Sequence, residues 1–167
     1  MRKLAAWGGL FLLLYVLQSS FLPLVAWRRV SPDLLLLVVV SVSLLRGCRQ
    51  GVFAGFMAGL LQDLATGTFL GTGILTKMLV GYSCGSFSQR LFREQSCIPV
   101  LAALASTVVQ YLAMAGLVYM LGFRFDIAEH IINYLPPMLL MNVIFAYPVH
   151  KLVCFLADGG DDRGQHI

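Results

Sequence analysis

The sequence predicts an all-α fold, a polytopic membrane bundle of about six transmembrane helices. Composition is the first indication: 59% of the 167 residues are hydrophobic and 12% are charged, whereas a soluble domain carries about 25% charged residues. The second is a series of apolar segments that approach the roughly 20 residues needed to cross a bilayer. The third is the placement of the basic residues between these segments. We therefore expect one transmembrane domain at residues 1–156 and a short polar cytoplasmic tail at residues 157–167.

The apolar segments give the order of the expected helices. The first is too long for the apolar part of a signal peptide and has no clear cleavage site, so we expect it to remain as a span. The second and third are short enough to form a tight hairpin that does not cross fully. Pro136 and Pro137 suit the entrance of the last span, which Pro148 is expected to bend. The six expected spans are Leu4–Leu22, Pro32–Leu45, Gly51–Leu64, Leu70–Phe87, Ile98–Leu121 and Leu135–Leu156.

The start of the second span has a helix-initiation signal in Ser31, Pro32 and Asp33. Ser31 is suited to the N-cap, Pro32 to the first helical position and Asp33 to the first turn, where a negative charge is favourable. The sequence therefore predicts a helix that begins at Pro32 and Asp33.

The charges indicate topology rather than nucleic-acid binding. The net charge is +4, but the twelve basic residues are scattered between apolar segments. With the amino terminus inside, three of them fall outside, Lys77 falls within the membrane, and eight fall on the cytoplasmic side, the bias expected of an inner-membrane protein. Both termini are thus predicted to be cytoplasmic. The eight are Arg2, Lys3, Arg46, Arg49, Arg90, Arg93, Lys151 and Arg163.

Glycines recur every four residues in the third and fourth spans. Gly51, Gly55 and Gly59 share one helix stripe with Asp63, and a second stripe contains Gly81 and Gly85 together with Gly73 and Lys77. Small residues let two membrane helices approach closely. We expect a partner transmembrane helix to pack on these stripes, and packing between helices of this chain is the alternative.

Asp63 and Lys77 are predicted to form an intramembrane charge pair near the outer edge of the bilayer. The lysine stem would lie across Gly59 and its ammonium would rise toward the carboxylate. In the alternative, Asp63 faces water at its helix end and Lys77 faces a wet cavity. Gly67 and Gly71 are expected to allow the tight outer turn between the two helices.

Three polar residues lie inside apolar runs, and each needs a hydrogen-bond partner in lipid. These residues, Gln18, Gln110 and Asn142, are expected to bond to other helices, with a small-molecule pocket as the alternative. No motif of a metalloprotease, serine hydrolase or phosphate-binding loop occurs. The four cysteines match no metal site and are expected to be reduced packing residues. The sequence thus predicts no enzyme activity, no metal and no cofactor.

About the first 90 residues carry an ordered series of short motifs, of which the block from Gly55 to Gly71 is the most specific. It joins a glycine stripe, an acidic residue and a glycine-rich turn. The series comprises Leu17-Gln18-Ser19, Pro32-Asp33 before a leucine-rich run, Gly55-Phe56, Gly59-Leu60-Leu61, Asp63, Gly67, Leu70-Gly71 and Gly81-Tyr82.

In these motifs the chain resembles the MreD family of rod shape-determining membrane proteins. The resemblance implies a non-enzymatic scaffold subunit of the bacterial cell-elongation complex, located in the inner membrane and acting in lateral peptidoglycan synthesis. It implies an MreC-like bitopic protein as the direct partner. An MreB-like filament, a RodA-like glycosyltransferase and a class B penicillin-binding protein would be indirect partners. The family is also similar in architecture to the substrate-binding subunits of energy-coupling-factor transporters, so a small-molecule-binding transporter subunit is the alternative.

Overall fold

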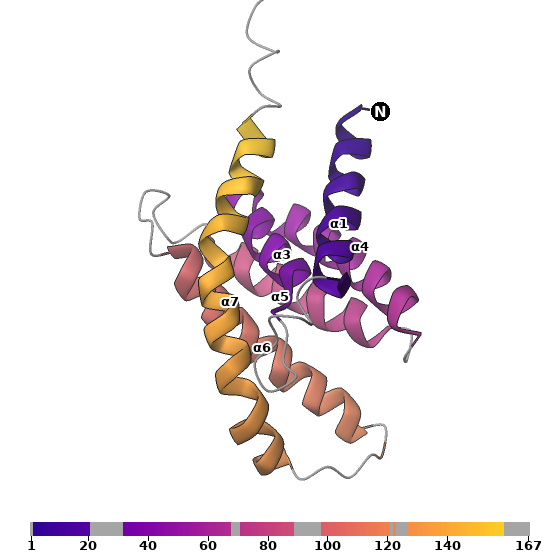
Figure 1. Ribbon diagram of the computed structural model, residues 1–167, viewed down its shortest axis with the longest axis vertical. Coiled ribbons are helices and arrows are strands. Elements are labelled where there is room, and N and C mark those ends of the chain that lie inside the picture. Colours follow the sequence, from indigo (N-terminus) through magenta and orange to yellow (C-terminus); the bar gives the residue numbers. More distant parts are fainter. Residues whose placement is uncertain are drawn as a thin grey trace, which may run out of the picture.

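The computed structural model describes residues 2–20, 32–67, 71–88, 98–120, 122 and 127–158. Within these residues all regular structure is helical, which confirms the all-α prediction (Figure 1). Each expected span overlaps one helix. The helices are α1 (Arg2–Ser20), α3 (Leu34–Arg46), α4 (Cys48–Thr66), α5 (Thr72–Ser88), α6 (Ile98–Met120) and α7 (Ile127–Asp158).

Helix α3 begins later than the sequence predicts. Asp33 is the N-cap, and its side chain accepts a hydrogen bond from the Leu36 amide. Pro32 is buried and precedes the cap, so the prediction of Pro32 and Asp33 within the first turn was wrong by two positions. Ser31 lies outside the described residues. A carboxylate at the N-cap accepts from an amide that has no intrahelical partner, so Asp33 is favoured at this position.

Helix α3 lies at the centre of the bundle and contacts every other described helix. Its residues from Leu34 to Ser43 are all buried. A helix that is apolar on every side is stable only when other helices or lipid surround it, and here other helices do. Around it pack Leu10, Phe11 and Leu14 of α1, Ala54 and Ala58 of α4, Ala103 of α6, and Val149 and Val153 of α7.

The glycine stripes pack helix α4 against helix α5 of the same chain. A Cβ added to Gly55 would collide with the Lys77 carbonyl, one on Gly81 with the Gly51 carbonyl, and one on Gly85 with the Cys48 backbone. Gly59 likewise faces the Ile74 backbone. The prediction that a partner helix packs on Gly51, Gly55, Gly59, Gly81 and Gly85 was therefore wrong. The alternative, close packing within the chain, is what the structure shows.

The lipid-facing character of the helices is uneven. Segments of α6 (Pro99–Leu117) and α7 (Tyr134–Ala157) are long and apolar enough to cross a membrane, whereas Gly8–Ser20 and Leu34–Arg46 are shorter apolar stretches. Large apolar side chains are exposed on α1, α4, α5, α6 and α7. The start of α1 and the end of α7 lie at the same end of the bundle (Figure 1). The crossing by all six helices and the cytoplasmic side of the termini stay predictions.

Replacing Gly55 by Leu is expected to separate α4 from α5, because the new side chain meets backbone atoms that cannot rotate away. We expect a loss of at least about 2 kcal/mol in the free energy of unfolding, in the upper range of overpacked cores. Thermal unfolding in detergent measures it.

Gly116→Leu is the matched control, since Gly116 is also helical and nothing lies within 4 Å of a Cβ added there. Its stability should stay within about 0.5 kcal/mol of the wild type. Equal stability of the two variants would contradict the close packing.

Candidate functional site

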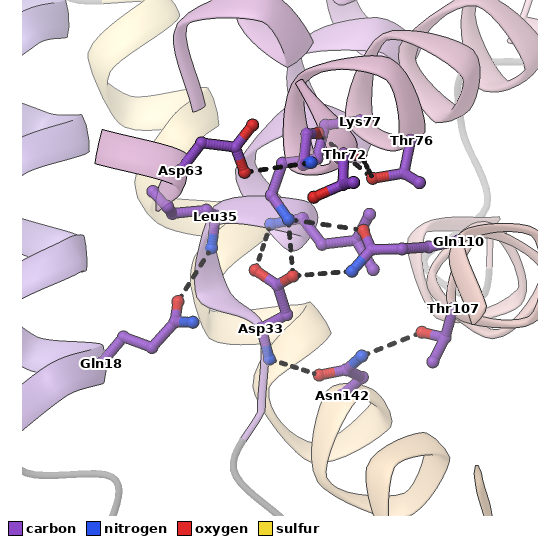
Figure 2. A network of polar contacts seen from close by, with 12 residues as sticks. Gln18, Asp33, Leu35, Asp63, Thr72, Thr76, Lys77, Thr107, Gln110 and Asn142 are labelled. Atoms are coloured by element: carbon purple, nitrogen blue, oxygen red, sulfur yellow. Dashed lines mark hydrogen bonds and ion pairs between the residues drawn. The ribbon is translucent and has the colours of Figure 1, made fainter. Parts of the chain in front are cut away.

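A cluster of buried polar side chains surrounds the start of α3. We call it the α3 N-terminal cluster. It brings together five of the described helices, and Asp33 lies at its centre (Figure 2). Its members are Gln18 of α1, Asp33 at the α3 N-cap, Lys77 of α5, Thr107 and Gln110 of α6, and Asn142 of α7.

Part of the cluster satisfies the first backbone amides of α3. Asn142 Oδ1 accepts from the Asp33 amide at 3.0 Å, and Asp33 Oδ1 accepts from the Leu36 amide at 3.0 Å. Gln18 Oε1 accepts from the Leu35 amide at 3.4 Å. The first amides of a helix have no partner within the helix, and an apolar interior provides no water to bond them. Side chains from α1, α3 and α7 therefore take the place of water.

The second part of the cluster is an ion pair between Asp33 and Lys77. The Lys77 Nζ lies 2.7 Å from Asp33 Oδ2, and the two side chains are 1% and 6% exposed. Gln110 bonds to both partners, because its Nε2 donates to Asp33 Oδ2 at 2.8 Å and its Oε1 accepts from Lys77 Nζ at 3.5 Å. A buried charge is tolerated only when it is paired and hydrogen-bonded. Here both charges meet that condition.

The predicted pair of Asp63 with Lys77 was wrong. The Asp63 carboxylate instead accepts from three backbone amides at the start of α5: Gly71 at 2.8 Å, Gly73 at 3.0 Å and Ile74 at 3.3 Å. These bonds occupy both of its oxygens and leave Lys77 to Asp33. Asp63 thus belongs to the α4–α5 connection, where an anion suits the amino end of a helix.

The turn glycines have the conformations that the sequence predicts. Gly67 is a left-handed C-cap of α4 with φ of 63°, and Gly71 has φ of 112°. Side chains disfavour both values, so glycine is the residue that fits. Their position on the outer side of a membrane stays a prediction.

The predicted bonding of Gln18, Gln110 and Asn142 to other helices is confirmed. Asn142 also donates from Nδ2 to Thr107 Oγ1 at 2.9 Å, and the Thr107 hydroxyl donates to the Ala103 carbonyl at 2.7 Å. Each of these three amide side chains therefore forms hydrogen bonds with other residues of the protein.

The role of Asp33 in this cluster was missed from the sequence, which predicts it only as a helix-start residue. The signal was present: Lys77 is the only basic residue inside an expected span other than Lys151 near a segment end, and Asp33 and Asp63 are both acids near the ends of neighbouring spans. Choosing between them requires the direction in which Lys77 leaves α5. That direction depends on how the helices pack.

The arrangement holds helices of the bundle together. The two charges neutralise each other, and in the described part of the chain no group of three or more His, Cys, Asp or Glu side chains could hold a metal ion. The fold and the cluster together define an all-helical membrane protein whose buried polar groups connect its helices.

The chain belongs to the MreD family of rod shape-determining proteins. The family model described as rod shape-determining protein MreD matches residues 1–157. No curated protein and no solved structure gives a significant match. The family match confirms the resemblance drawn from the sequence motifs and identifies a membrane protein that acts in rod-cell shape. The architectural similarity to transporter subunits stays a prediction.

Neutralising one partner of the Asp33–Lys77 pair is expected to cost more than neutralising both. Lys77→Met and Asp33→Asn should each destabilise the protein by about 3 to 5 kcal/mol, because each leaves an uncompensated buried charge. In the double variant no charge remains, and the asparagine introduced at the cap position still suits a helix start. The double variant should therefore lose much less stability than the sum of the losses of the two single variants. Unfolding in detergent measures all three. Strict additivity would contradict the pair.

Asp63→Asn is expected to act independently of Lys77→Met. The two side chains share no bonding partner, so their effects on stability should add to within about 0.5 kcal/mol. A coupling of more than about 1 kcal/mol in this cycle would instead support the Asp63–Lys77 pair.

Proposed function

We propose that this protein is a non-enzymatic scaffold subunit of the bacterial cell-elongation complex in the inner membrane. In this role it binds an MreC-like bitopic protein and supports lateral peptidoglycan synthesis together with an MreB-like filament, a RodA-like glycosyltransferase and a class B penicillin-binding protein. Membership of the MreD family supports the assignment to cell shape.

The observation that carries the scaffold role is the saturation of the α3 N-terminal cluster. Buried polar and charged side chains in a membrane domain are functional candidates by default. Here the carboxylate of Asp33 is engaged by Lys77, Gln110 and the Leu36 amide. A general base or a ligand-binding carboxylate needs a free position toward its substrate. A structural role for the cluster supports a protein that acts by shape and binding.

The partner would bind the outer surface of the bundle rather than the glycine stripes. Those stripes are occupied by α4 and α5 themselves. The faces that remain are formed by exposed apolar side chains, such as Leu12, Leu13 and Leu17 of α1 and Leu112 and Tyr119 of α6. Binding through such faces needs the bundle to be folded but needs no chemistry from its core.

Loss of this protein from its own cell should convert rods to rounded cells without a defect in small-molecule uptake. In cells that lack the protein, a folded double variant with Lys77→Met and Asp33→Asn should restore rod shape. The reason is that the scaffold role needs an intact bundle but needs no buried charge. Cell width and length by microscopy measure the outcome.

Co-purification in mild detergent tests the partner. The tagged protein should retain the MreC-like protein of the same cell, whereas the tagged Gly55→Leu variant, with a disrupted α4–α5 hairpin, should retain less. Rod shape that persists without the protein, together with lost uptake of a nutrient, would favour the transporter alternative and reject the scaffold. Failure to retain the MreC-like protein would reject the proposed partner.

A further inference from the structure

The bundle exposes apolar side chains over two different heights. On α6 they run from Leu101 to Met120, or roughly 30 Å along the axis at 1.5 Å per residue. On α7 they run over a similar length from Tyr134 to Phe155, with the exposed Lys151 four residues before its end, where a lysine can snorkel to the interface. On α4 they run from Phe53 to Leu64, or roughly 17 Å along the axis. The apolar band on α5, from Leu75 to Phe87, is similarly short. Tilting a helix can only reduce the depth that it crosses, so α4 and α5 cannot match a hydrocarbon core about 30 Å thick.

Polar groups close the short band at both ends. Arg49 and Gln50 are exposed at the start of α4, and Thr66 and Gly67 are exposed at its end. On the neighbouring helix α5, the Ser83 hydroxyl donates to the Leu79 carbonyl at 2.8 Å. A hydroxyl in contact with lipid needs such a partner within the protein. The height of the band is therefore set by its own sequence.

The connected end of the α4–α5 hairpin lies close to the level of the α3 N-terminal cluster. Asp33 bonds to Gln110, which lies near the middle of α6, so α3 lies beside one half of α6 only. Lys77 reaches the same level and lies little more than one turn from the start of α5. The α4–α5 hairpin therefore ends soon after this level, whereas α6 and α7 continue beyond it (Figure 1).

We propose that the exposed face of α4 and α5 is a surface for a locally thinned bilayer, covered by acyl chains whose hydrophobic depth is less than that beside α6 and α7. The short height of this face favours lipid over a partner helix, because a partner span of about 20 residues would extend beyond it. The small residues that allow the closest helix approach are already used inside the bundle. Gly55, Gly59 and Gly81 face the contact between α4 and α5, and Gly51 faces Ser43 of α3 as well as Gly81. The exposed side chains are large: Phe53, Phe56, Leu64, Leu75, Leu79, Tyr82 and Phe87.

Single lysine substitutions test the height of the band, because a lysine near an interface can snorkel to water and one at mid-depth cannot. Phe53→Lys and Leu64→Lys should both be tolerated, since each lies near one end of the α4 band. Leu112→Lys on α6 is the matched control: Leu112 is as exposed as Phe53 and lies two residues from Gln110, near the middle of α6.

The readout is the yield of monodisperse protein from membranes. We expect both α4 variants near the wild-type yield and Leu112→Lys reduced by about tenfold, consistent with the depth-dependent cost of a charge. If Phe53→Lys or Leu64→Lys loses as much protein as Leu112→Lys, the α4 band is not short and the proposal is overturned.

A second measurement distinguishes lipid from protein cover. Spin labels at Leu79, Phe53 and Leu64 in phosphatidylcholine vesicles with 18-carbon chains should be reached by oxygen, and the two α4 labels should also be reached by a water-soluble nickel complex. A label at Leu112 should be reached by oxygen alone. Exclusion of both reagents from Leu79 would show protein cover and reject the proposal, as would exclusion of nickel from both α4 labels.

Discussion

The central constraint on this fold is that α3 begins inside the bundle, where its first amides have no water to bond. Each of these amides has to find an acceptor on another part of the chain. Asn142, Gln18 and the cap residue Asp33 provide acceptors for the amides of Asp33, Leu35 and Leu36. The carboxylate that caps the helix then needs a cation, which Lys77 supplies, and Gln110 orients both charges. The positions of α1, α5, α6 and α7 around α3 thus follow from one helix end.

Much of the fold could be predicted from the sequence, because apolar runs and turn glycines are local signals. All six expected spans contain a helix, and Gly67 and Gly71 have the positive φ values that made glycine necessary. The partner of Lys77 could not be predicted in the same way. Asp33 lies 44 residues from Lys77 and Asp63 only 14, so sequence distance favours the wrong acid. Helix rotation decides the choice, and it follows from how α4 and α5 pack through their glycines.

The glycine stripes predict that a helix packs closely on them, but they do not indicate which helix it is. Close packing of small residues is equally favourable between two helices of one chain and between two chains. In this protein the α4–α5 connection is short, and Asp63 binds the amides at the start of α5. That connection keeps α5 beside α4, and the contact between these two helices leaves no room for another helix on the glycine stripes.

The residues of the α3 N-terminal cluster are spread along the chain, so they become available one after another during synthesis. The ribosome delivers Asp33 first, then Lys77, then Gln110 and finally Asn142. The central helix is therefore among the first to be made and the last to be enclosed, since its amide at Asp33 finds its acceptor only when α7 arrives. Until then, the Asp33 amide lacks the acceptor that it has in the folded bundle. A truncated chain that stops before Asn142 cannot complete its own core.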